Sequence, residues 1–396
     1  MPDPSIDRGR NRLIDVIRGL ALLMVIISHF GLIPKWTGIP HHRIWGRTLD
    51  EINSGMGYYG VVVFFVISGF LITTNSLRRY PAPNQIDFAD FWWLRFARLV
   101  PMLVLCAVAM CVCQIFALSG MNFYSGRHLG AAIAALFAFR YNDYIGVNTA
   151  PAAWNPLWSL SVEEMFYLVL PLVARLWSGA GATIWTCLMI VTTAFYLKLR
   201  GMAGAFDALG CMDLLGLGCI LALLRPGRLV GAVSARRCAA WGAAAAVVGS
   251  GTVVVTVLAA GPLDYPYSPV ICALGAVGLL LASQWLSSTS WLGRALWPVS
   301  LAGVISYEAY LLHDPARSYL GFWGWSNDTL TLVVVLAAAW LIHRYFSEPF
   351  NLALRQLPGF ARRPPRTGGP TWANLWIRAG ALVAALFLAG FFARHH

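Results

Sequence analysis

The chain contains a series of apolar windows of about 20 residues, separated by short polar or Gly/Pro-rich stretches. A helix needs a window of about that length to cross the hydrocarbon core of a bilayer. Backbone groups find no water there, so a spanning segment of this kind must be helical. The pattern predicts an all-α fold, a polytopic transmembrane helix bundle with ten core spans plus a C-terminal eleventh helix. The expected spans lie near 13–33, 56–77, 91–118, 157–177, 183–200, 206–225, 237–260, 268–287, 298–318, 328–348 and 373–393.

Composition supports a membrane protein rather than a nucleic-acid binder. The chain is 58% hydrophobic and 12% charged, whereas about a quarter of the residues of soluble domains are charged. The net charge of +12 comes mostly from short loops between apolar windows, as the preference for positive cytoplasmic loops requires. We expect a multi-pass membrane protein in contact with membrane lipid and no nucleic-acid partner. The oligomeric state is left open.

The charge pattern also predicts a domain organisation. We expect a cytoplasmic N-terminal segment at 1–12, a transmembrane domain at 13–350, a cytoplasmic Pro/Arg-rich loop at 351–372 and an additional transmembrane helix at 373–396. The basic residues before the first apolar run resemble those of a signal peptide. The run is too long for one and no cleavage pattern follows, so we expect it to be retained as a span.

The sequence also predicts the structural roles of several shorter stretches and single residues. We expect an outer loop at 34–55 and a re-entrant or interfacial helix at 128–141, which is too short to cross a membrane. Asp207 and Asp213 are expected to pair with buried arginines. Lys198 falls on the outer side, against the charge preference. The eight cysteines include no Cys-x-x-Cys, so we read them as small buried hydrophobes and expect no metal site.

The first apolar run carries three polar groups that are expensive in hydrocarbon: Asp15, Arg18 and His29. Arg18 and His29 are eleven positions apart, almost three helical turns, so they share one helix face about 16 Å apart along the axis. Asp15 lies one turn before Arg18 and is its expected ion-pair partner. His29 could act as a general base or accept an acyl group itself.

Two arginines open the third span. Arg95 and Arg98 are spaced i, i+3, so their guanidinium groups point the same way and could bind a phosphate. They could equally be ordinary cytoplasmic arginines, and the aromatic residues beside them suit an interfacial belt as well as an adenine platform.

Two further stretches gather acids and a histidine. Glu163 and Glu164 lie just inside an expected helix start, where the helix dipole favours carboxylates. Either could instead orient His29 or bind sugar hydroxyls. The stretch 306–315 brings His313 and two acids to the end of the ninth span. His313 could contact the substrate, but the pattern slightly favours an interfacial polar tip.

Five stretches together resemble the acyltransferase 3 family of membrane O-acyltransferases. They match its Arg-x10-His motif, its Phe-Phe-x-x-Ser-Gly-Phe-Leu-Ile segment, its Arg-x-x-Arg pair and two segments around Trp-Ser-Leu-Ser-Val-Glu-Glu and Ser-Tyr-Glu-Ala-Tyr-Leu-Leu-His. In this chain they occupy 18–29, 64–72, 95–98, 158–167 and 305–313. There are two departures: the usual Leu-Asp-Gly-Leu-Arg-Gly opening appears here as Ile-Asp-Val-Ile-Arg-Gly at 14–19, and Met165 stands where Gln is common. Neither touches a titratable position. Some family members carry a soluble domain after the last helix, and none is expected here.

The resemblance implies transfer of an acetyl or longer acyl group from cytoplasmic acetyl-CoA, or another acyl-CoA, to an extracytoplasmic or lipid-linked glycan such as lipopolysaccharide. Arg18, Arg95 and Arg98 would hold the CoA phosphates. His29 would be catalytic, by direct transfer or through an acyl-histidine, with Glu163 or Glu164 orienting it. The expected substrate contacts are Trp158, Ser161, Tyr307 and His313.

Three alternatives remain open on the sequence. The acceptor could be a small hydrophobic molecule such as a macrolide, which the same motifs allow. The polar face of the first span could be the proton relay of a transporter, which a pH-gradient uptake assay would reveal. It could also be a packing device in a scaffold without enzymatic activity.

Overall fold

The computed structural model describes residues 11–175, 180–224, 234–260, 265–286, 295–357 and 372–394. Within these ranges the chain is almost entirely helical, and its strands are the two-residue pair β1 (Arg43–Ile44) and β2 (Arg47–Thr48). Eight of the described helices are long and apolar enough to cross a membrane, and two shorter apolar helices cover Ala208–Leu224 and Asn374–Ala389. The all-α fold is confirmed. The count of ten spans plus an eleventh stays a prediction.

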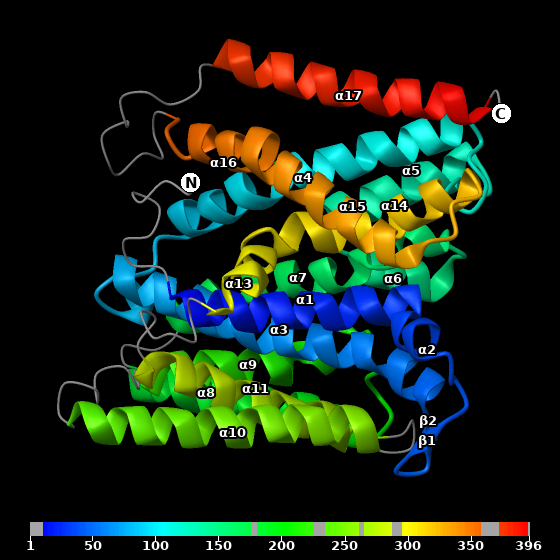
Figure 1. The fold of residues 1–396 in the computed structure, drawn as a ribbon. Helices are drawn as coiled ribbons and strands as arrows, with labels where there is room; N and C mark the ends of the chain where they lie inside the picture. Colours follow the sequence, from blue (N-terminus) through cyan, green and yellow to red (C-terminus); the bar gives the residue numbers. More distant parts are fainter. Residues whose placement is uncertain are drawn as a thin grey trace. The chain divides into compact units, whose positions relative to one another are not determined.

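The described residues form two compact units, which are treated separately below (Figure 1). The first unit falls within Met1–Arg79, Ala180–Ala205 and Leu209–Ser306, and the second within Tyr80–Gly179, Phe206–Ala208 and Tyr307–His396. The helices of the first unit are α1 (Arg12–Phe30), α2 (Leu32–Thr37), α3 (Leu49–Arg79), α8 (Ala180–Leu199), α9 (Ala208–Leu224), α10 (Ala235–Ala259), α11 (Tyr267–Trp285) and α13 (Trp297–Val304). Those of the second are α4 (Phe88–Ile115), α5 (Gly126–Phe137), α6 (Tyr141–Val147), α7 (Leu157–Arg175), α14 (Ser306–Phe322), α15 (Asp328–Ile342), a π-helical turn (His343–Ser347), α16 (Glu348–Leu354) and α17 (Trp372–Arg394), with short 3₁₀ turns at Pro83–Gln85 and Ala152–Trp154.

In the first unit, α1 packs between α3 and α13 (Figure 1). The contact with α13 depends on two glycines. A Cβ atom on Gly19 would lie 2.0 Å from the carbonyl oxygen of Val299, and one on Gly303 would lie 1.8 Å from that of Asp15. Small residues at such crossings let helix backbones approach closely inside a membrane. The glycine that follows Arg18 is therefore needed for packing, whatever the arginine does.

The same device joins α3 to α9. A Cβ atom on Gly69 would lie 2.0 Å from the Leu215 carbonyl oxygen, and one on Gly218 would lie 2.1 Å from that of Val66. Gly69 belongs to the family-like stretch 64–72, so this part of the resemblance has a packing explanation.

Both ends of α1 are fixed by local chemistry. The Asn11 side chain accepts a hydrogen bond from the Leu13 N–H at 3.0 Å and donates to the Ser283 carbonyl at 2.7 Å. At the other end Gly31 adopts a left-handed conformation, with φ 62°, and closes the helix. This capping favours glycine, which has no Cβ penalty there. The helix therefore ends at Phe30, three residues before the predicted end of the span.

Three other sequence predictions need correction. The predicted span 298–318 is two helices, because Ile305 leaves helical geometry with φ −91° and ψ 10°. The expected outer loop 34–55 contains α2, the β1–β2 pair and the beginning of α3. Of the Pro/Arg-rich loop, 351–354 belong to α16, whereas 358–371 lie outside the described residues.

The second unit has an apolar core formed mainly by α4, α5, α6 and α7. Trp154 is almost completely buried within it, and its indole N–H donates to the Met121 carbonyl at 2.8 Å. The stretch expected at 128–141 is helical as α5, and its 12 residues are too few to cross a membrane. None of the eight cysteines forms a disulfide, and seven of them are buried, as expected for small hydrophobes.

Candidate active site

The helix α1 carries Arg18 and His29 without interruption, as the sequence predicts. Arg18 is half-buried and its Nη2 donates to the Ser306 hydroxyl at 2.8 Å. Asp15, one turn earlier, is 5% exposed. His29 lies in the last turn of α1 and its side chain is exposed. The structure thus places the two motif residues on one unbroken helix of the first unit, Arg18 in its second turn and His29 in its last.

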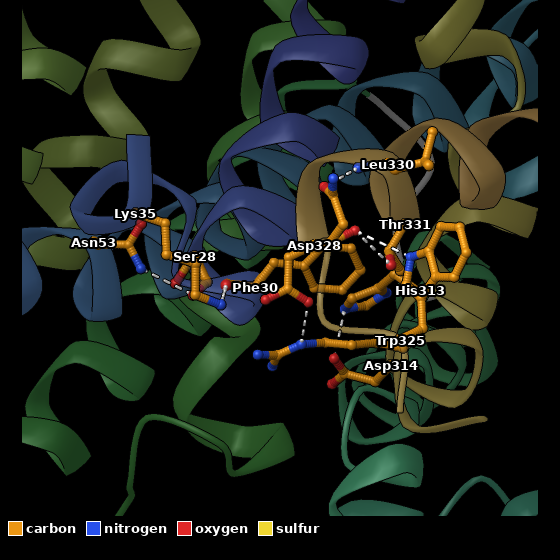
Figure 2. Close-up of polar contacts among 12 residues, drawn as sticks. Ser28, Phe30, Lys35, Asn53, His313, Asp314, Trp325, Asp328, Leu330 and Thr331 are labelled. Carbon is orange, nitrogen blue, oxygen red and sulfur yellow. Dashed lines mark hydrogen bonds and ion pairs between the residues drawn. The ribbon is translucent and has the colours of Figure 1, made fainter. Parts of the chain in front are cut away.

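Two residues that the sequence analysis missed hold the end of α1 that bears His29. The amide nitrogen of Asn53 donates to the Ser28 carbonyl at 3.0 Å, and the Lys35 ammonium donates to the Phe30 carbonyl at 2.8 Å (Figure 2). Carbonyls in the last turn of a helix lack partners within the helix, and a cation there also complements the helix dipole. These contacts fix the backbone on both sides of His29.

On α4 of the second unit, Arg95 is enclosed by aromatic rings. Its guanidinium carbon lies 5.3 Å from the centre of the Tyr167 ring and 6.0 Å from that of Phe91. Its Nε is buried and has no hydrogen-bond partner among the described residues. Arg95 also attracts the carboxylates of Glu163 and Glu164 electrostatically. A guanidinium held by rings with an unused N–H is well suited to bind a phosphate.

The carboxylates belong to the second turn of α7. Glu164 is 4% exposed, and one of its oxygens is buried without a hydrogen-bond partner in the described part of the chain. Glu163 is half-buried and accepts a long hydrogen bond from the Tyr167 hydroxyl at 3.5 Å. Arg98, one turn after Arg95, also attracts Glu164. The structure therefore brings the predicted arginine pair and the predicted acids together within the second unit.

Two predicted substrate contacts on α7 have structural partners. The Ser161 hydroxyl oxygen accepts a hydrogen bond from the backbone N–H of Tyr141 at 2.9 Å, at the beginning of α6. Trp158 is 8% exposed and packs edge-on against Phe206, with ring centres 4.8 Å apart. Their roles toward a substrate stay predictions.

The helix α14 carries the other two predicted substrate contacts, Tyr307 and His313. The Tyr307 hydroxyl donates to the Leu99 carbonyl at 3.2 Å. His313 is completely buried, so the interpretation of it as an exposed interfacial tip is wrong. Its Nδ1 lies 2.6 Å from the Tyr310 carbonyl oxygen, which can only accept. The Nδ1 of His313 therefore donates to this carbonyl, and its Nε2 lies 3.8 Å from a carboxylate oxygen of Asp314.

A polar network around Glu308 was not predicted. This carboxylate is 2% exposed and accepts a hydrogen bond from Ser347 at 2.5 Å and another from Nδ1 of His343 at 3.0 Å. Both donors belong to the π-helical turn, and such turns are frequent at functional sites. No spacing in the sequence links them to Glu308, because they lie more than 30 positions later in the chain.

The first unit contains a buried ion pair. Lys198 on α8 and Asp213 on α9 are joined at 2.7 Å, and each side chain is only 1% exposed. The prediction of a buried arginine partner for Asp213 is wrong, since the partner is a lysine. The pair also explains how a lysine that fits poorly with the charge preference is accommodated.

Comparison with known proteins supports the family expected from the motifs. The sequence model of the acyltransferase 3 family, described as "Acyltransferase domain", matches residues 11–394. A peptidoglycan O-acetyltransferase OatA of Listeria monocytogenes is 25% identical over 334 residues, which are 76% of this chain and 48% of that protein.

Two shorter matches agree. The O-acetyltransferase OatA of Staphylococcus aureus is 33% identical over 150 residues, 36% of this chain and 24% of that protein. A putative peptidoglycan O-acetyltransferase YrhL of Bacillus subtilis is 30% identical over 155 residues, 37% of this chain and 24% of that protein. The chain matches no more than about half of the length of these relatives. The match to the family model over nearly all described residues, together with the multi-pass helical fold, shows that the chain belongs to the acyltransferase 3 family.

Proposed function

We propose that this protein is a membrane O-acetyltransferase of the bacterial cytoplasmic membrane that moves an acetyl group from cytoplasmic acetyl-CoA to a hydroxyl of a cell-wall glycan. The observation that carries the proposal is the ring-enclosed Arg95 with its buried, unpartnered Nε beside Arg98 and two carboxylates. The names of the three relatives support acetyl transfer, and two of those names specify peptidoglycan as acceptor.

The donor would be held through its phosphates. Arg95 and Arg98 supply guanidinium donors in the geometry that phosphate oxygens accept, and Arg18 supplies a third cation. The aromatic rings around Arg95 restrict its rotamers, so less side-chain entropy is lost when a phosphate binds. We propose that no metal takes part, since the arginines can bind the phosphates directly.

His29 would perform the chemistry. Its imidazole takes the proton of the acceptor hydroxyl while the oxygen attacks the thioester carbonyl. The C–S bond then breaks, the acetyl group stays on the acceptor oxygen, and the CoA thiolate recovers the proton from the imidazolium. Glu163 or Glu164 would orient or neutralise the imidazole. Asn53 and Lys35 would act as positioning residues, because they hold the backbone around His29.

The remaining predicted residues would bind the acceptor. Sugar hydroxyls are recognised by fixed donors and acceptors, and the buried His313 would be one of these groups. Tyr307, Trp158 and Ser161 would shape the same region of the second unit.

The test uses the purified full chain in nanodiscs with labelled acetyl-CoA and a peptidoglycan glycan. We expect transfer by the wild type, loss of turnover with CoA binding retained in His29→Ala, and loss of CoA binding in Arg95→Ala. The matched controls are His42→Ala, at an exposed histidine, and Arg140→Ala, whose arginine pairs with Asp143 on the surface. Full turnover in His29→Ala would refute the mechanism, and a wild type that neither binds CoA nor acetylates any glycan would refute the function.

A further inference from the structure

Three buried side-chain atoms on neighbouring helices of the second unit have no hydrogen-bond partner among the described residues: the Tyr141 hydroxyl, one oxygen of Glu164 and Nε of Arg95. Tyr141 is 0% exposed and Glu164 is 4% exposed. Burying such an atom without a partner costs about 1–3 kcal/mol. Unsatisfied groups of this kind therefore point to a ligand or a water that completes them.

The helix α7 links the three atoms. The Ser161 hydroxyl accepts the backbone N–H of Tyr141, which attaches the first residue of α6 to α7. Glu164 lies one turn further along α7. One turn beyond that, the Tyr167 ring covers the guanidinium of Arg95. A single segment of α7 thus carries Glu164, covers Arg95 and holds the backbone of Tyr141.

The helix α4 gives these groups an order. Arg95 and Arg98 come first, followed by Leu99, whose carbonyl receives the Tyr307 hydroxyl. Cys106 comes further along and belongs to the same buried cluster as Tyr141, against which Tyr307 packs. The eleven positions from Arg95 to Cys106 correspond to about 16 Å of helix. Cations therefore occupy the first part of this stretch and an uncharged hydroxyl its far end.

This order matches one kind of ligand. Its phosphates would meet the arginines, and uncharged polar groups would follow at increasing distance from them. The donor of an acyl-CoA reaction has this sequence of groups, because its phosphates continue into an arm that contains amides and ends at the thioester. Each amide offers one N–H donor and one C=O acceptor.

We propose that the Tyr141 hydroxyl and the Glu164 carboxylate bind the amide-bearing arm of the acyl donor, with Tyr141 donating to an amide carbonyl and Glu164 accepting an amide N–H. The proposal rests on the proposed function, since it assumes a CoA donor. It assigns Glu164 to the donor and leaves Glu163 as the carboxylate for His29. It also gives a role to Tyr141, which belongs to no family-like stretch.

The test measures CoA affinity of the full chain in nanodiscs by calorimetry, which requires no turnover. Tyr141→Phe removes the hydroxyl and keeps the buried ring. We expect CoA to bind about 3- to 10-fold more weakly, the value of one lost hydrogen bond. The matched control is Tyr144→Phe on the same helix, because the Tyr144 hydroxyl already donates to the His128 carbonyl at 3.1 Å. That variant should bind CoA like the wild type.

A second ligand separates the arm from the phosphates. Adenosine 3′,5′-bisphosphate has phosphates and no amide arm, so wild type and Tyr141→Phe should bind it equally. Glu164→Leu removes a negative charge beside Arg95 and should bind it at least as tightly as the wild type. Retained binding also shows that the variants are folded. Arg95→Ala should lose affinity for both ligands. Glu164→Leu should lose affinity for CoA alone.

Three results would overturn the proposal. CoA affinity unchanged in Tyr141→Phe would mean that the hydroxyl meets only a structural water. Equal weakening toward CoA and the bisphosphate would mean that the hydroxyl supports the fold. A change confined to the KM of the glycan would place it at the acceptor. In each of these cases a wild type that binds CoA leaves the proposed function intact, whereas a wild type that does not bind CoA removes both.

Discussion

The two units differ in whether their buried polar groups have hydrogen-bond or ion-pair partners among the described residues. In the first unit, Lys198 and Asp213 satisfy each other, and Asn11 and Asn53 bond to backbone carbonyls. In the second, Arg95, Tyr141 and Glu164 each have a buried atom with no hydrogen-bond partner among the described residues. Of the six such atoms found in the described parts of the chain, five belong to the second unit. Because an unpaired buried group destabilises a fold and a ligand can satisfy it, this contrast separates polar groups that stabilise from polar groups that bind.

The largest expected effect tests the claim that the first unit uses its ion pair for stability. Lys198→Met leaves the Asp213 carboxylate buried and unpaired, which should lower the free energy of unfolding by about 3–5 kcal/mol. The measurement is thermal or denaturant unfolding in detergent. The double variant Lys198→Met with Asp213→Leu removes both charges and should recover most of the loss. A double variant as unstable as the single one would contradict the stabilising role of pairing.

In the second unit we expect substitution of Arg95 to weaken CoA binding and to change the unfolding stability little. Arg95→Lys keeps a positive charge but loses the planar guanidinium, so we expect CoA binding to weaken by about 1.5–3 kcal/mol. Unfolding should change far less than in Lys198→Met, because Nε has no protein partner to lose among the described residues. Arg140→Lys is the control, at an exposed arginine. If Arg95→Lys destabilised the fold and left CoA binding intact, the contrast between the units would fail.

Features set by neighbouring residues could be predicted from the sequence, whereas features set by contacts between distant parts of the chain could not. Hydropathy and length are local, so the apolar windows and the helix that carries Arg18 and His29 could be predicted. The break at Ile305 could not, because the apolar pattern continues across it. Arg95, Arg98 and Glu164 were found through short motifs. Tyr141 was missed because its significance comes from contacts between α4, α6 and α7 that no spacing records.

The close contact between α1 and α13 allows a test of how packing stabilises the first unit. Gly303→Ala places a Cβ atom 1.8 Å from the Asp15 carbonyl oxygen, so α13 must move away from α1. Overpacking of this kind costs about 1–3 kcal/mol. Gly181→Ala is the control, since nothing lies within 4 Å of its Cβ position. We expect lower unfolding stability only for Gly303→Ala. Equal stability of the two variants would show that the crossing tolerates a methyl group.

The smallest expected effect concerns the positioning of His29. Asn53→Ala removes the donor to the Ser28 carbonyl and should cost about 0.5–1.5 kcal/mol of stability. If the contact also positions the imidazole, kcat should fall several-fold while the KM for acetyl-CoA stays constant, because Arg95 is untouched. Ser54→Ala is the neighbouring control, since the Ser54 hydroxyl bonds only within its own helix turn, to the Asp50 carbonyl. A loss of stability with unchanged kcat would place Asn53 with Lys198 and Asp213, among the groups that stabilise the first unit without acting on its chemistry.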